Sequence, residues 1–110
     1  MVTEDDRKFV GQFQIYQQQL QSLLIQKENM KLQILEIEKA LEELEQSKVA
    51  HAFKIAGPIM IKKSSEDLKT ELKERKENFD MRIKSLEKAE TRTTTKLKEM
   101  EPRLKELMKG

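Results

Sequence analysis

The sequence predicts a mainly α-helical protein in which two long helices form an antiparallel coiled coil with one β-hairpin at the bend. Apolar residues recur at spacings of three and four in two long segments, a heptad pattern typical of coiled coils. A short segment between them places apolar residues at alternate positions around the Gly57-Pro58 pair, which indicates a hairpin. Charged residues make up 38% of the chain and hydrophobic residues only 36%, too few for a wide globular core.

The first helix is expected at about residues 4–47. Thr3 begins it, because its hydroxyl can accept a hydrogen bond from the N–H of Asp6 while the Asp6 carboxylate reaches back. Nine of its ten seam positions are apolar or aromatic, which over five heptads indicates a coiled coil. The a positions are Phe13, Leu20, Lys27, Ile34 and Leu41, and the d positions are Tyr16, Leu23, Met30, Ile37 and Leu44.

The hairpin is expected at about residues 49–63. Ala56, Gly57 and Pro58 are assigned to its turn, and Pro58 is tolerated because it stands at the start of the second strand. One strand face is expected to carry Val49, His51, Phe53 and Ile55, and a face of the return strand Ile59, Ile61 and Lys63.

The second helix is expected at about residues 65–107, after a second capping sequence from Ser64 to Asp67. Pro102 removes one backbone hydrogen bond, so the helix should kink or fray near Glu101. The a positions are Lys69, Lys76, Ile83, Glu90, Leu97 and Leu104, and the d positions are Leu72, Phe79, Leu86, Thr93, Met100 and Leu107.

The two heptad registers are compatible with one antiparallel pair. Residues whose numbers add to 113 bring every a position opposite a d position, and this register centres the bend on the proposed turn. Lys27 and Glu90 then occupy adjacent layers of the seam. Two interpretations are open for them: both side chains extend to solvent, or they form a cross-helix pair that fixes the register.

No catalytic, cofactor or metal site is predicted, so an enzyme is not expected. The chain has no cysteine and one histidine, His51, which is expected to be a packing or rim residue. Its glycines are isolated, so no phosphate-binding loop is present. The abundant carboxylates lie on helix faces expected to be solvated.

Charge and hydropathy argue against nucleic acid and membrane partners. The net charge is only +2 and both long segments mix the two signs, which favours a solvated surface over a nucleic-acid stripe. Lys54, Lys62 and Lys63 form a small basic spot, interpreted as protection of a strand edge. No apolar run approaches a membrane span, and a cytoplasmic protein is expected.

Two groups of apolar residues are not fully accounted for by a two-helix seam. An isolated hairpin is marginal in water, so the apolar hairpin residues are expected to be buried by other subunits. Outside the seam and at the helix ends, apolar side chains either are ordinary exposed residues or form a flexible surface that binds varied partners. The apolar residues outside the seam and at the helix ends are Phe9, Val10, Ile15, Leu24, Ile25, Leu32, Leu35, Met81, Leu104, Leu107 and Met108.

Three segments resemble the beta class of prefoldin: 13–21, 36–44 and 53–63. The most specific parts are the tyrosine and glutamines of 16–19 and the Lys-Ile-Ala-Gly-Pro-Ile run that starts at Lys54. The resemblance implies a hexamer of two alpha-class and four beta-class subunits, whose hairpins form a double β-barrel body. It further implies that the coiled-coil tips hold unfolded proteins without ATP and pass them to a group II chaperonin.

The resemblance also implies roles for particular residues. The subunit contacts would be Val49, Phe53, Ile55, Ile59, Met60 and Ile61, and the client-binding tips would be Phe9, Val10, Phe13, Ile15, Tyr16, Leu104, Leu107 and Met108. Pro102 and the threonines of 93–95 depart from the family pattern, so the resemblance does not predict the length and order of the C-terminal arm. The alternatives are a structural coiled-coil spacer without client binding and a nucleic-acid-binding arm.

Overall fold

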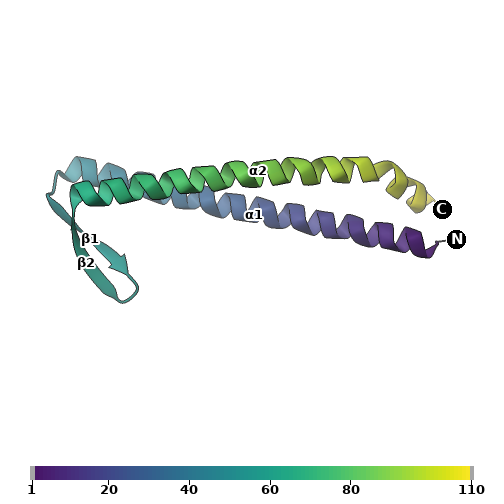
Figure 1. Ribbon diagram of the computed structural model, residues 1–110, viewed down its shortest axis with the longest axis horizontal. Coiled ribbons are helices and arrows are strands. Elements are labelled where there is room, and N and C mark those ends of the chain that lie inside the picture. The colour runs from purple at the N-terminus through teal and green to yellow at the C-terminus, as the bar shows by residue number, and fades with distance from the viewer. Residues whose placement is uncertain (1, 110) are drawn as a thin grey trace. The chain divides into compact units, whose positions relative to one another are not determined.

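The computed structural model describes residues 2–109, which form two long helices and one antiparallel hairpin (Figure 1). The order is α1 (Glu4–Ser47), β1 (His51–Ala56), β2 (Ile59–Ser64) and α2 (Ser65–Lys109). The predicted fold class is therefore confirmed. Internal packing divides the chain into two units. The terminal unit combines the residues up to Glu28 with those from Lys84 onward, and the hairpin unit comprises Asn29–Ile83.

Helix α1 begins with a capping box and ends before a residue in the left-handed conformation. Asp6 donates its N–H to the Thr3 hydroxyl at 3.1 Å and accepts the Thr3 N–H on Oδ2 at 3.0 Å, which confirms the predicted capping box. At the other end, Lys48 has a φ of 52°, the left-handed conformation that commonly follows a helix. This residue therefore turns the chain out of α1 before β1 begins.

The predicted seam positions follow the less exposed face of each helix, and Leu68, the most buried apolar residue of α2, lies outside them. All ten seam positions assigned to α1 and all twelve assigned to α2 are buried or half-buried. Within the hairpin unit, Glu38 pairs with Lys76 at 3.2 Å and Glu45 with Lys69 at 3.1 Å. Since the position on α2 falls as the position on α1 rises, the two helices of this unit run antiparallel, as predicted.

The hairpin turn is tighter than the sequence interpretation assumed. Ala56 pairs with Ile59, so the turn consists of Gly57 and Pro58 alone and Pro58 does not start the second strand. Gly57 has a φ of 59° and proline holds φ near −65°, a combination that matches a type II′ turn. Val49 was also misplaced: it precedes β1, because the turn at Lys48 delays the strand to His51.

Pro102 lies inside α2 and does not end it. The helix continues to Lys109, so of the two outcomes expected near Glu101, kinking or fraying, fraying does not occur. The missing hydrogen bond of proline bends a helix where it occurs, and Figure 1 shows the C-terminal turns of α2, in yellow, curving away from the preceding ones.

Candidate functional site

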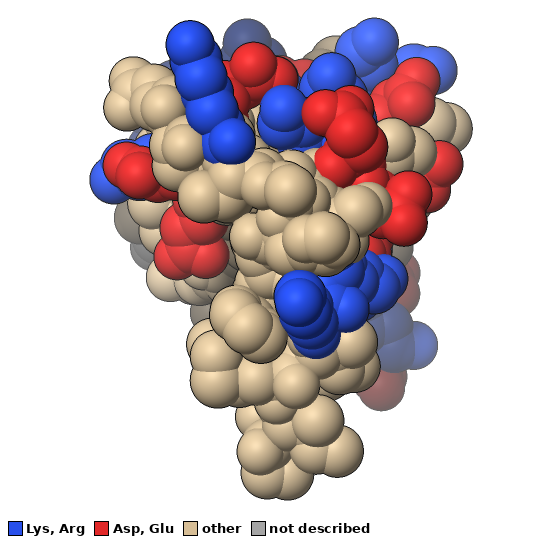
Figure 2. Space-filling view, turned by 90° about the vertical axis from the view of Figure 1, so that its left-hand side faces the viewer, with Lys and Arg blue, Asp and Glu red and all other residues tan. Residues whose placement is uncertain are grey.

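The hairpin carries an exposed apolar surface, which we call the hairpin surface. Its members are the six apolar residues singled out from the sequence, and each is between 42% and 74% exposed. They are Val49, Phe53, Ile55, Ile59, Met60 and Ile61. Figure 2 shows the hairpin as a projection without acidic side chains at its lower end. A large part of each of these apolar side chains therefore faces water.

The strand register assigns the hairpin residues to two faces. Phe53 lies opposite Lys62 and Ile55 opposite Met60, and directly opposed residues share a face. We call this the outer face, and it also includes His51. The inner face carries Lys54 and Lys63 together with Ala52, Ile59 and Ile61. The six residues of the hairpin surface are thus not confined to one face.

Glu71 of α2 binds the inner face at its base. Its carboxylate accepts hydrogen bonds from Lys54 of β1 and, at 3.0 Å, from Lys63 of β2. The bond from Lys54 is the first cause, and that from Lys63 the second, of a lowered pKa of Glu71. One carboxylate therefore holds both strands against the helix. No sequence pattern predicts this role, because Glu71 lies outside the seam and its partners come from the hairpin.

The base of the hairpin is also fixed through the backbone. The Ser65 N–H donates to the Ala50 carbonyl at 2.9 Å, and the Ser65 hydroxyl donates to the Val49 carbonyl at 2.5 Å. Ser65 is only 4% exposed, and the neighbouring Ser64 hydroxyl accepts the Asp67 N–H at 3.1 Å. The start of α2 and the start of β1 are therefore held together.

An open concavity of about 380 Å³ lies between the hairpin and the helices of the hairpin unit. Its lining includes Leu44, Leu68 and Leu72 from the helices and residues 52–55 of β1, so Phe53 and Ile55 border it as well as Ala52 and Lys54. It is a predominantly apolar recess at the hairpin surface, and its charged lining residues are Glu43, Lys54 and Arg75.

Most of the residues predicted at the client-binding tips are half-buried. Of the eight residues predicted there, Ile15 and Met108 are exposed, at 54% and 79%. The other six are half-buried: Phe9, Val10, Phe13, Tyr16, Leu104 and Leu107. The sequence interpretation also missed Val2, which is exposed. Away from the ends, Leu24, Ile25, Leu32, Leu35 and Met81 are exposed as well.

Arg103 covers one of the half-buried residues. Its guanidinium lies 4.4 Å from the centre of the Phe9 ring and 3.4 Å from Asp6 Oδ1. The pKa of Asp6 is lowered, first by its hydrogen bonds with Thr3 and to a smaller extent by Arg103. This contact could have been predicted from the sequence, because the antiparallel register places Arg103 beside Phe9.

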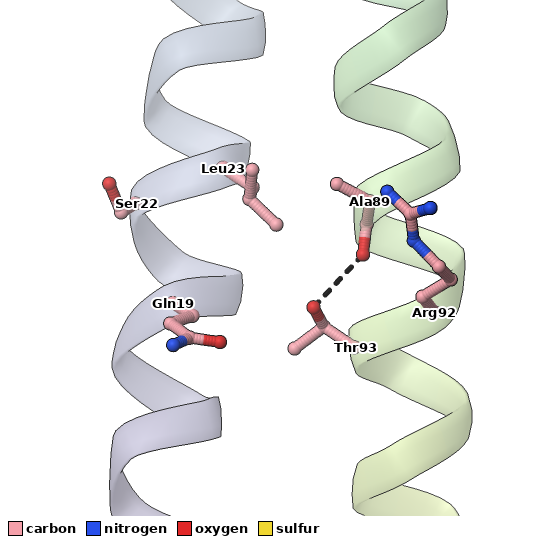
Figure 3. A pocket seen from close by; sticks show the side chains of 6 residues that line it. All are labelled: Gln19, Ser22, Leu23, Ala89, Arg92 and Thr93. Carbon is pink, nitrogen blue, oxygen red and sulfur yellow. Dashed lines mark hydrogen bonds between the residues drawn. The ribbon is translucent and has the colours of Figure 1, made fainter.

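The polar interruption of the seam is an ion pair followed by a groove. Lys27 Nζ donates to Glu90 Oε2 at 2.7 Å, and the two side chains are 16% and 27% exposed. Of the two interpretations left open, the structure supports the cross-helix pair. Beside it is a groove of about 370 Å³ (Figure 3), where the Thr93 hydroxyl turns back to the Ala89 carbonyl at 2.9 Å.

Among residues 2–109, no three His, Cys, Asp or Glu side chains are grouped as a metal site would require. Neither α1 nor α2 contains a stretch long and apolar enough to cross a membrane.

The fold and its exposed hairpin define a class, the two-helix coiled-coil proteins with a β-hairpin at the bend. The profile of the family described as prefoldin subunit matches residues 7–110. The chain belongs to the prefoldin subunit family, and this membership indicates a chaperone role.

Individual relatives agree with this assignment. Prefoldin subunit beta of Thermococcus kodakarensis is 37% identical over 92 residues, which cover 83% of this chain and 79% of that protein. The Archaeoglobus fulgidus protein of the same name is 33% identical over 103 residues, which cover 93% of this chain and 89% of that protein. The crystal structure of the prefoldin beta subunit from Thermococcus strain KS-1 matches with a TM-score of 0.81 at 30% identity, covering 100% of this chain and 97% of that chain.

Proposed function

We propose that this chain is a beta-class subunit of an ATP-independent chaperone that holds unfolded polypeptides and passes them to a group II chaperonin in the cytoplasm. Residues 1–110 act as a single prefoldin-like domain in this proposal. The observation that carries it is the exposure of all six residues of the hairpin surface. Large apolar side chains gathered on a two-stranded hairpin favour burial by other chains, because such a hairpin is marginal alone.

The hairpin surface supports assembly with other prefoldin subunits. Alpha-class subunits would cover its outer face, in a hexamer of two alpha-class subunits and four beta-class copies of this chain whose hairpins form a double β-barrel body. Glu71 and Ser65 hold the hairpin base on α2. A partner therefore meets a surface that is already oriented, which lowers the entropic cost of binding.

Client binding is assigned to the helix ends. Ile15 and Met108 are exposed there, and the six half-buried tip residues present part of their apolar surface. Each contact would be weak, but several subunits around one client would raise the total affinity through their high effective concentration. In this proposal nucleotide plays no part in binding or release.

The test is protection of an unfolded client from aggregation by the assembled complex. Replacing Ile15 and Met108 together with Ser removes exposed apolar area at the ends without touching a seam position. Protection should fall, and adding ATP should change nothing. The matched control is Met81→Ser, which removes an exposed methionine from α2 in the hairpin unit. Equal protection by all three proteins would mean that the ends are not the client surface, and would direct attention to Leu24, Ile25 and Leu32.

A second candidate function is a structural spacer that assembles but binds no client. The half-burial of six of the eight predicted tip residues favours it. The same assay separates the two functions, because a spacer complex of full mass would give no protection at any stoichiometry.

A further inference from the structure

We infer that the outer face of the hairpin is complementary to a different chain that presents an aspartate or glutamate to Lys62, and not to a second copy of this chain. The inference rests on the proposed role of the hairpin surface in assembly and adds the chemistry of the partner.

The inner face is already engaged near its base. Lys54 and Lys63 both donate to Glu71, and Ala52, which lies directly opposite Lys63, is half-buried. Two of the three hairpin lysines are therefore compensated by a carboxylate of α2. At the base of the hairpin, the outer face is the one that remains free for another chain.

The outer face combines an apolar row with one uncompensated cation. Phe53, Ile55 and Met60 are all exposed, and Lys62 lies directly opposite Phe53. Among residues 2–109, no carboxylate forms an ion pair with Lys62.

A partner that covers the apolar row changes the surroundings of Lys62. Packing against Phe53 and Ile55 removes water beside the lysine, and a charge left without water or a counter-ion is strongly destabilising. A carboxylate from the partner would pair with the ammonium while the aromatic and aliphatic side chains are buried. The expected partner surface is therefore an apolar strand that carries an acidic side chain.

A second copy does not meet this requirement. Residues 49–65 contain Lys54, Lys62 and Lys63 and no acidic residue. Two outer faces in contact would each contribute an uncompensated Lys62 and no carboxylate. Like charges across an interface select against the wrong partner, so the composition of the hairpin disfavours pairing with itself through this face.

The test measures assembly with the alpha-class subunit of the same organism, using light scattering and a binding titration at low and high salt. Lys62→Glu should weaken assembly by about tenfold or more, and Lys62→Gln by a smaller factor. Both variants should also lose part of the salt dependence of the wild-type protein. Lys31→Glu is the matched control, an exposed lysine on α1 with the same change of charge, and it should bind as the wild type does.

Two results would overturn the inference. If Lys62→Glu and Lys62→Gln assemble as tightly as the wild type, while Phe53→Asp abolishes assembly, the hairpin surface is the interface but Lys62 meets no acid. If the chain alone forms a stable oligomer at low salt that Phe53→Asp disrupts, the occupant of the outer face is a second copy. Full assembly of Phe53→Asp would instead contradict the proposed function itself.

Discussion

Lys27 and Glu90 form an ion pair within the seam of the terminal unit, with 2.7 Å between Nζ and Oε2. The hydrogen bond from Glu90 is the main cause of a raised pKa of Lys27, and partial desolvation opposes it. Polar pairs at seam positions specify register. This pair is satisfied only when residue 27 of one helix lies beside residue 90 of the other.

Lys27→Leu is expected to destabilise the protein, because it leaves the Glu90 carboxylate half-buried without its partner. The double variant Lys27→Leu/Glu90→Leu should regain the lost stability, since two apolar side chains then fill the seam. Thermal unfolding of the four proteins gives the coupling in a double-mutant cycle. Coupling indistinguishable from zero would mean that the pair contributes nothing.

Glu71→Gln is expected to loosen the hairpin base in a pH-dependent way. The pKa of Glu71 is lowered in the folded chain, so its contribution is present above the ordinary glutamate value of 4.5 and is lost as pH falls through the lowered value. Hydrogen exchange of β1 amides should therefore be faster in the variant at pH 7, and the difference should disappear in stronger acid. Glu74→Gln, an exposed neighbour on α2, should have no such effect.

Gly57→Ala is expected to weaken the hairpin through backbone strain alone. The φ of 59° disfavours any residue with a Cβ, whereas no atom lies within 4 Å of the added carbon. A cost of about 1 kcal/mol corresponds to roughly fivefold faster amide exchange in the strands. Gly11→Ala should act in the opposite direction and stabilise α1, because Gly11 is inside a helix with open space around it. Unchanged exchange in Gly57→Ala would refute the strain argument.

Thr93→Leu is expected to stabilise the terminal unit. The groove in Figure 3 provides space for a larger side chain, and the change removes a hydroxyl that now bonds back to Ala89. The free energy of unfolding should rise by about 1 kcal/mol, as for one additional partly buried aliphatic group. Thr91→Leu is the control, since Thr91 makes the same type of bond to Glu87 from an exposed position. An equal gain in both variants would point to helix propensity instead of packing.

The heptad pattern predicted the buried stripe because burial in a two-helix coiled coil follows the sequence period directly. Boundaries were less predictable: the left-handed Lys48 and the two-residue turn at Gly57 displaced Val49 and Pro58 from their assigned places. The element boundaries depend on single backbone torsion angles, which the periodicity of apolar residues does not predict. The roles of Glu71 and Arg103 depend on contacts between distant segments of the chain. The helix register could have predicted the contact of Arg103, but no sequence pattern predicts the contacts of Glu71.

The central claim is that the hairpin surface assembles this chain with alpha-class subunits, and the native mass of a mixture of the two tests it most directly. The account predicts a complex of two alpha-class subunits and four 13.0 kDa copies of this chain. Replacing Phe53 and Ile59 with Asp should abolish that complex while circular dichroism shows the helices retained. A mixture in which this chain stays apart from the alpha-class subunit, or a double variant that still assembles fully, would contradict the account.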